Sequence, residues 1–147
     1  MPLKRVEHWD TRAFHNFAKS NRATPFKWGE WDCCLAAASF VQAITGIDIG
    51  QNFRGKYTDE ASAMATIASV TGGKTIEDAL EWVAKKYGLP ERIHPLMAQR
   101  GDLVLVKNND GNLIAGVVHL TGRHVLTVGP KGAAMLSIMQ IQRAWKI

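Results

Sequence analysis

The feature that most constrains this chain is the segment Trp28-Gly29-Glu30-Trp31-Asp32-Cys33-Cys34, which leads directly into an apolar stretch ending at Gly46. Aspartate is favoured at the position before a helix, and glycine is typical of the position just after one. Because the stretch is apolar nearly all round, it predicts a central, buried helix with Cys33 as its first residue. Alanines at positions 36, 37 and 38 keep this helix slim, so we expect a sheet to approach it closely.

A cysteine at the start of a helix has the chemistry of an activated thiol. Only the thiolate is a nucleophile, and a free pKa of about 8.5 leaves little of it at neutral pH. The N–H groups and dipole of a first helical turn favour the thiolate, and the N–H groups of Cys33 and Cys34 could hold an oxyanion. Local chemistry leaves an alternative open, in which both cysteines are small buried hydrophobes. Adjacent cysteines cannot staple a fold, so we expect no disulfide and a reducing compartment.

Composition excludes several classes of protein. The 147 residues, 46% hydrophobic and 21% charged, are typical of one folded domain. No apolar window approaches the roughly 20 residues of a membrane span, and the first residues predict no secretory signal. The net charge of +5 suits weak attraction to acidic partners, but the basic residues are scattered, which disfavours nucleic-acid binding. The 5 histidines lack paired ligand spacing, so we expect neither a metal nor a cofactor.

The hydrophobic period changes along the chain. The front part predicts helices at about 11–20, capped by Asp10 or Thr11, and at 33–45, 59–70 and 76–87. The back part predicts strands at 102–106, 113–120, 125–128 and 133–138. Helices followed by strands indicate an α+β fold, with an antiparallel sheet packed on the helices. We expect a single domain over 1–147, with an N-terminal helix (1–24), the cysteine helix and helical part (25–98) and the antiparallel sheet (99–147).

Two motifs resemble a known family. Trp28-Gly29 followed by Trp31-Asp32-Cys33-Cys34-Leu35 is similar to the nucleophile segment of NlpC-type cell-wall peptidases, where an aromatic-Gly pair precedes an Asp-Cys-Ser-Gly helix start. Arg100-Gly101-Asp102-Leu103 resembles the Gly-Asp-Leu strand of the same family. The resemblance covers about residues 25–145 and implies a papain-like fold. It makes Cys33 the nucleophile, Asp32 the cap and Cys34 part of the oxyanion site, with Trp28 and Trp31 in the core or lining a substrate groove.

A wider set of segments resembles one branch of that superfamily, small proteins encoded beside the tail genes of tailed phages and prophages. The set is Phe26-Lys27-Trp28-Gly29, Phe53-Arg54-Gly55-Lys56-Tyr57, Arg100-Gly101-Asp102 and the closing Arg143-Ala144-Trp145-Lys146-Ile147. This resemblance implies a tail-tip or baseplate protein of the virion, made in the host bacterial cytoplasm. Its expected partners are other tail-tip or baseplate subunits, with peptidoglycan as a further candidate.

The chain departs from the family at the catalytic histidine. Active enzymes open the next strand with a pattern like His-Val-Gly-Ile, and matching its glycine to Gly116 puts Ile114 at the histidine position. His119 falls on the opposite face of that strand unless a bulge at Gly116 reverses the alternation, and His124 opens the following strand. A degenerate, structural tail module is therefore the favoured function. The alternatives are a peptidase or amidase that pairs Cys33 with His119 or His124, and a small basic nucleic-acid-binding domain.

Overall fold

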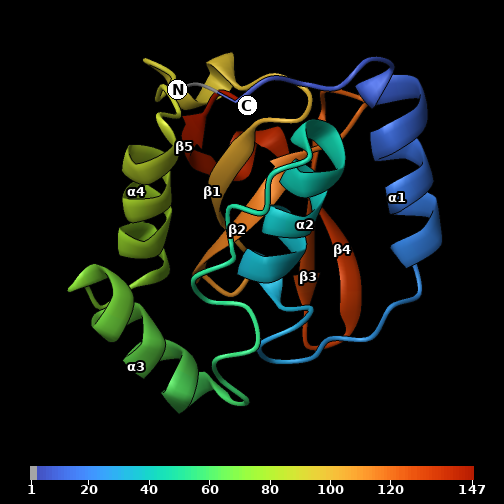
Figure 1. The fold of residues 1–147 in the computed structure, drawn as a ribbon. Helices are drawn as coiled ribbons and strands as arrows, with labels where there is room; N and C mark the ends of the chain where they lie inside the picture. Colours follow the sequence, from blue (N-terminus) through green and yellow to red (C-terminus); the bar gives the residue numbers. More distant parts are fainter. Residues whose placement is uncertain (1–2) are drawn as a thin grey trace.

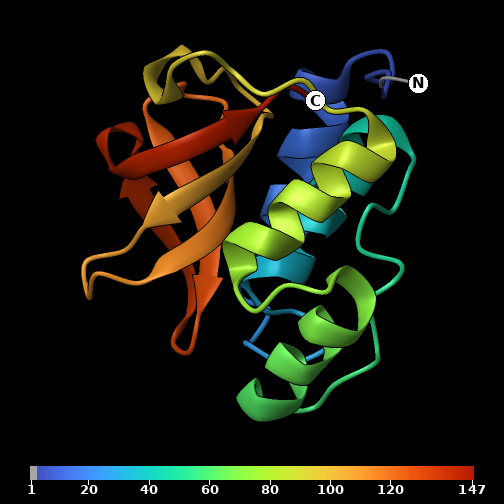
Figure 2. The ribbon, with the colours of Figure 1, turned by 90° about the vertical axis from the view of Figure 1, so that its left-hand side faces the viewer.

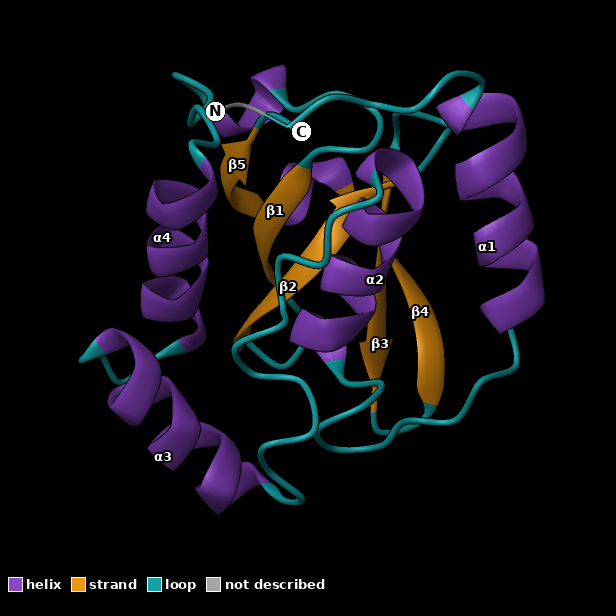
Figure 3. Cartoon of the chain, viewed as in Figure 1, coloured by secondary structure: helices purple, strands orange, loops and turns teal. Residues whose placement is uncertain are grey.

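The computed structural model describes residues 3–147 and shows an α+β fold, with helices followed by a sheet (Figures 1 and 3). The helices are η1 (Trp9–Phe14), α1 (His15–Asn21), α2 (Cys33–Thr45), α3 (Glu60–Thr71) and α4 (Ile76–Tyr87). The strands are β1 (Leu103–Lys107), β2 (Leu113–Val118), β3 (His124–Gly129), β4 (Gly132–Ser137) and β5 (Ile141–Trp145), with short helices η2 (Pro95–Met97) and η3 (Ile138–Gln140). The predicted fold class and the order of its parts are confirmed.

Side-chain caps fix the starts of three helices. Asp32 caps α2 through a bond from the Leu35 N–H, and Gly46, with φ +81°, ends it. Capping boxes start the other two, formed by Asp59 with Ser62 in α3 and by Thr75 with Asp78 in α4. These motifs satisfy backbone N–H groups that the first helical turn leaves unpaired. The predicted bounds of α2, α3 and α4 are confirmed to within about two residues.

The first helix differs from its prediction. It begins at Trp9 with the π-helical turn η1, which runs directly into α1. His8 precedes the turn in the left-handed region, at φ 56°, and no side chain caps this end. The prediction of a cap by Asp10 or Thr11 is therefore wrong, because both residues already lie inside the helix.

The sheet has the strand order β4-β3-β2-β1-β5, and every neighbouring pair is antiparallel. The edge strands β4 and β5 are joined only by the three residues of η3. In a flat sheet of this size the edges would lie roughly 19 Å apart, which is beyond the roughly 14 Å that such a connection can span. The sheet is therefore strongly curled, as Figure 2 shows.

Strand β5 is the element that the sequence-based prediction lacks. It adds to β1 at the edge of the sheet, with a register shift between Leu105 and Val106. The predicted second strand also ends early, at Val118, because the chain turns from Leu120 to Arg123. Alternation in β5 is disturbed by the same shift, which explains why its period was weak in the sequence.

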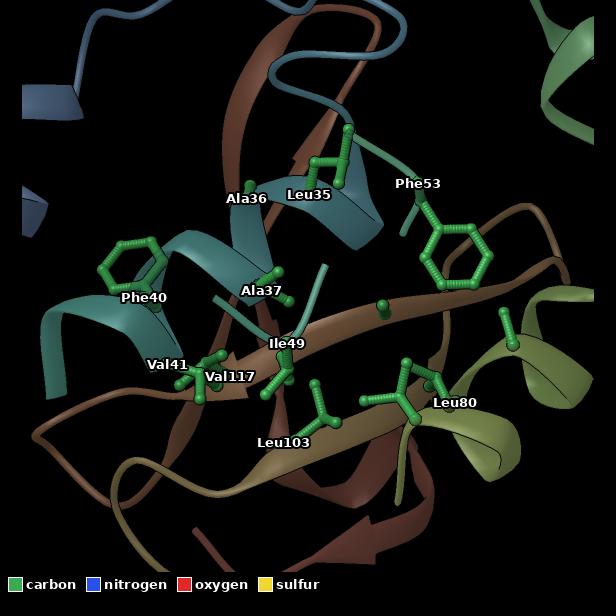
Figure 4. Packing of buried hydrophobic residues seen from close by; sticks show 14 of the residues in the cluster. Leu35, Ala36, Ala37, Phe40, Val41, Ile49, Phe53, Leu80, Leu103 and Val117 are labelled. Carbon is green, nitrogen blue, oxygen red and sulfur yellow. The ribbon is translucent and has the colours of Figure 1, made fainter. Parts of the chain in front are cut away.

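The two faces of the sheet contribute to different clusters of buried side chains. Leu103 and Val117 belong to the cluster between the sheet and the helices, in which Val117 lies beside Val41 of α2 and Leu103 lies near Ile49 and Leu80 (Figure 4). Val104, Val106 and Val118 point to the other face and pack inside the curl. Helix α3 packs on α4 at the side of this body (Figure 1).

A buried carboxylate ties the start of the sheet to distant segments. Asp102 is 0% exposed, and its Oδ2 accepts bonds from Arg92 Nε at 2.9 Å and from the Gln99 N–H at 2.9 Å. Its Oδ1 lies 3.4 Å from Arg5 Nη2 and 3.4 Å from the N–H of Ile147. Asp102 thereby holds the chain before η1, the loop after α4 and the last residue together.

No helix in the described range, residues 3–147, is long and apolar enough to cross a membrane.

We expect Asp102→Asn to lower the free energy of unfolding by about 3–5 kcal/mol, because it removes one partner of a buried ion pair. Urea denaturation followed by tryptophan fluorescence measures this change. Asp110→Asn, in the exposed turn between β1 and β2, is the matched control and should stay within about 0.5 kcal/mol of the unaltered protein. Equal effects of the two substitutions would contradict a structural role for Asp102.

Candidate functional site

The Asp32 carboxylate organises the start of α2. It is 2% exposed, and its Oδ1 accepts the Leu35 N–H at 2.9 Å. Its Oδ2 accepts two further bonds, from the Gly29 N–H at 3.1 Å and from the Tyr57 hydroxyl at 2.6 Å. Hydrogen bonds to a buried carboxylate are strong, so these contacts fix the position at which the helix begins and thus the position of Cys33.

Two of the sequence segments meet at this carboxylate. Gly29 has φ +82°, and a Cβ there would lie 2.0 Å from the Tyr57 carbonyl oxygen, so only glycine fits. The Gly55 N–H donates to the Gly29 carbonyl at 2.7 Å. Burial, followed by the charge of Asp32, raises the pKa of Tyr57, so the phenol stays protonated and donates. The segments 26–29 and 53–57 therefore hold Asp32 together.

Cys33 and Cys34 form an asymmetric pair of thiols at the start of α2. Both are partly exposed, and their sulfur atoms lie 3.9 Å apart. The Cys34 thiol lowers the pKa of Cys33 by hydrogen bonding to it; burial opposes this shift, and the Ala115 N–H reinforces it. The pKa of Cys34 is raised well above its ordinary value by its bond to Cys33 and by burial. Of the two thiols, Cys33 is therefore the one whose ionisation the surroundings favour.

Strand β2 presents a backbone group to the Cys33 sulfur. Ala115, fully buried, belongs to the cluster on the helix face of the sheet, and its N–H hydrogen-bonds to Cys33. By sequence, Ile114 is expected at the position opposite Cys33. In the structure Ile114 packs against the cluster on the other face of the sheet and also lines the cavity beside the thiols. The residue opposite Cys33 is therefore Ala115, and neither side chain can accept a proton.

The two candidate histidines lie at the far ends of their strands. The register between β1 and β2 is continuous from Leu113 to Val117, so no bulge at Gly116 turns His119 toward Cys33. His119 follows the last residue of β2, roughly 13 Å along the strand direction from Ala115. Its ring packs on Phe14, with centroids 6.1 Å apart.

His124 lies beside His119. It is the first residue of β3, and its carbonyl accepts the His119 N–H at 2.8 Å. Its Nδ1 lies 3.2 Å from the hydroxyl of Thr121, on the exposed turn that joins the two strands. Burial, and secondarily His124, lowers the pKa of His119. The structure thus brings the histidines together with each other and not with Cys33.

The candidate groove tryptophans have different surroundings. Trp28 lines the cavity beside the thiols and makes edge contacts with Phe26 and Tyr57, at centroid distances of 5.0 and 6.4 Å. Trp31 is 9% exposed and packs against Phe17 in the core, with its buried Nε1 lacking a hydrogen-bond partner among the described residues. Trp28 is therefore placed to touch a ligand, whereas Trp31 is a core residue.

A cavity of about 630 Å³ opens beside Cys33 and Cys34. Its walls come from the start of α2, the inner faces of α3 and α4, and the ends of β2 and β3, where Ile114 and Val128 lie. Its volume falls in the range of roughly 300–1,000 Å³ that is usual for small-molecule sites. The histidines are not among the residues that line it. No group of three or more candidate metal ligands occurs within residues 3–147.

Two residues of the site were not singled out from the sequence. Tyr57 ends a segment with an obvious pattern, but only the folded chain shows that its hydroxyl reaches Asp32, 25 positions away in sequence. Ala115 has no chemical signal of its own, since it contributes through a backbone N–H. The strict alternation of β2 was the one available clue, because it places residues 113, 115 and 117 on the same face.

The fold and the site together define an α+β domain with an activated thiol at a helix start beside an apolar cavity. The chain matches, over residues 4–147, the family described as a domain of unknown function (DUF6950), and it belongs to that family. No curated protein matches it.

We expect Cys34→Ala to raise the pKa of Cys33, because it removes the thiol that hydrogen-bonds to the Cys33 sulfur. The rate of Cys33 alkylation by iodoacetamide, followed by mass spectrometry across a pH series, should then rise at higher pH than in the unaltered protein. Cys34→Ser keeps a hydroxyl donor, so the midpoint of its curve of alkylation rate against pH should lie at a lower pH than that of Cys34→Ala. One midpoint shared by all three proteins would contradict the coupling between the thiols.

Proposed function

We propose that this chain is a tail-tip or baseplate protein of tailed phages or prophages. In this proposal it has an NlpC-type, papain-like fold that is retained as a structural, subunit-binding module. The fold assignment is supported by the Asp-Cys start of a buried helix, by the Gly-Asp start of the first strand and by the antiparallel sheet packed on that helix. The tail role is supported by the set of sequence segments that resembles the tail-associated branch.

The observation that carries the structural role is the group that faces Cys33 from β2. That group is the N–H and methyl of Ala115. Cleavage of an amide by a thiol requires an acid that protonates the leaving amine, and a base that later activates water. Ala115 can do neither, so the site keeps its nucleophile and its cap without the proton carrier of a peptidase.

An active peptidase is the alternative with the same fold. It would require His119 or His124 to come within hydrogen-bond distance of Cys33, which is about 3 Å. Both rings lie at the opposite ends of β2 and β3 from the cavity. Moving them to Cys33 would require the central strands of the sheet to be rebuilt, so the geometry favours the structural role.

A nucleic-acid-binding domain is disfavoured by the use of its arginines. Arg5 and Arg92 bind Asp102, and Arg54 binds Asp48 at 2.9 Å. Arg143 bonds three carboxylates, those of Glu77, Glu81 and Glu91. These guanidinium groups hold the fold together, so fewer cationic groups remain for phosphates than the net charge suggests.

The four segments that resemble the tail-associated branch have structural roles here. Segments 26–29 and 53–57 hold Asp32, and Asp102 of the third segment joins the termini. In the fourth, Arg143 links β5 to α4 and stacks on Trp145, with its Cζ 5.0 Å from the ring centroid. A pattern in which every segment stabilises the fold is what a structural module requires.

We expect the purified protein to release no product from peptidoglycan stem peptides or crosslinked dimers above the level of Cys33→Ala, because the site lacks a proton carrier. Liquid chromatography with mass spectrometry after overnight incubation measures this. Product formed by the unaltered protein and not by Cys33→Ala would overturn the structural reading. In that case His119→Ala and His124→Ala would identify the base.

In a phage or prophage that encodes this chain, we expect the protein to co-purify with tail particles through a density gradient. Cys33→Ala should remain bound in unchanged amount, because the proposed role requires the fold and not the thiol. Asp102→Asn, which weakens the fold, should reduce the bound fraction and serves as the matched comparison. Absence of the unaltered protein from the particles would exclude the tail role, whatever the peptidase assay shows.

A further inference from the structure

The cavity beside Cys33 has walls that suit a hydrocarbon chain. Its length is lined by apolar side chains from every surrounding element, among them Trp28, Met64, Ile67, Leu80 and Val128. This composition differs from that of a cleft for acidic, polar cell-wall peptides. Burial of a methylene contributes about 0.8 kcal/mol, so a linear chain is bound in proportion to its length.

Four charged residues within the described range line the cavity, and two of them, Asp32 and Glu77, are engaged by other groups of the protein. Asp32 is saturated by three hydrogen bonds, and Glu77 is paired with Arg143 at 2.9 Å. Glu60 and Lys74 are of opposite sign, and Lys74 is the only cation among the described residues that line the cavity. A ligand with several carboxylates would find a single cation on these walls, whereas an uncharged chain needs none.

A thiolate without a proton carrier is limited in the acyl compounds it can use. Attack on an amide stalls, because an amine leaves only when it is protonated. Attack on a thioester does not stall, because the leaving thiolate is a stable anion. Cys33, whose thiolate is favoured and which has only Ala115 opposite it, therefore fits an exchange between thioesters.

We propose that Cys33 accepts a linear acyl chain from a soluble acyl thioester and that the chain lies in the cavity. The Cys33 thiolate attacks the carbonyl carbon and forms a carbon–sulfur bond, while the bond from that carbon to the carrier sulfur breaks. The carrier leaves as a thiolate with the bonding electrons and takes a proton from water. This acceptor role goes beyond the proposed tail function and does not require it.

The start of α2 supplies the remaining requirement, which is a place for the oxyanion. The Leu35 N–H is bonded to the Asp32 carboxylate and the Ala36 N–H to the Asp32 carbonyl, at 2.9 and 2.8 Å. The N–H groups of Cys33 and Cys34 stand ahead of them in the first turn, where developing negative charge is stabilised. Since no base activates water, the acylated Cys33 persists.

Intact-mass spectrometry of the full chain with acetyl- and octanoyl-coenzyme A tests the proposal. We expect one adduct, mapped to Cys33, removed by neutral hydroxylamine and absent from Cys33→Ala. Each methylene that enters the cavity should raise the rate about three- to fourfold, so octanoyl transfer should exceed acetyl transfer by more than about tenfold. No octanoyl adduct, equal rates, or an adduct only on Cys34 or lysine would overturn the proposal.

A pair of variants on α3 tests whether the chain occupies the cavity. Ala63→Phe fills the cavity from its wall, whereas Ala65→Phe adds the same ring on the exposed side of the helix. We expect Ala63→Phe to lower the ratio of octanoyl to acetyl rates by at least about fivefold, with an unchanged far-ultraviolet circular dichroism spectrum as evidence of folding, and Ala65→Phe to leave the ratio unchanged. An unchanged ratio in Ala63→Phe, or an equally lowered ratio in both variants, would overturn the placement of the acyl chain in the cavity. A second measurement serves if Ala63→Phe does not fold. Saturating octanoate should compete for the cavity and slow octanoyl transfer to the unaltered protein. An unchanged rate in the presence of octanoate would overturn the placement of the chain in the cavity.

Discussion

The bonds to the Asp32 carboxylate determine where α2 begins, and the rest of the site depends on that position. One oxygen receives the helix N–H of Leu35, and the other receives the Gly29 N–H and the Tyr57 hydroxyl. Because the group is buried, each bond fixes a segment that would otherwise be a free loop. Cys33 follows Asp32 directly, so the loops before and after α2 position the thiol against β2.

A second buried carboxylate, Asp102, has the corresponding role in the sheet. It immediately precedes β1 and joins the Arg5 segment, the Arg92 loop and the last residue. Each aspartate thus fixes a different part of the fold. Asp32 holds the start of the cysteine helix, and Asp102 holds the start of the sheet, the Arg5 segment and the last residue. Between them the alanines of α2 and the small residues of β2 pack closely, which brings the Ala115 N–H to the Cys33 sulfur.

The resulting site has an environment that favours the thiolate of Cys33, and no histidine within residues 3–147 lines the cavity beside it. The pKa of Cys33 is lowered by the Cys34 thiol and by backbone N–H groups of α2 and β2, and the start of a helix favours negative charge as well. The histidines are remote because the β2–β3 turn, which carries them, is at the opposite end of the strands from the cavity. Thioester exchange needs only a nucleophile and an oxyanion site. The acyl-acceptor proposal is therefore compatible with the structural proposal.

The sequence by itself determined the local features of this protein. The caps Asp32, Asp59 and Thr75 fix helix starts through contacts three residues away, and the change of period separates helices from strands. It also predicted Cys33 as the first residue of the central helix, because a helix start is a local signal. These properties depend on near neighbours in the chain, so they can be recognised before the fold is known.

Only the tertiary structure decided what faces Cys33. The register of β2 places Ala115 there and turns Ile114 to the other face, and the shift in β5 hid that strand's alternation. The contacts of Tyr57 with Asp32 and of Arg5 with Asp102 join residues 25 and 97 positions apart. Such contacts arise from packing between whole elements, and a one-residue change of register reverses every side chain of a strand. The sequence therefore determined where the thiol lies, and the fold determined that His119 and His124 lie away from it.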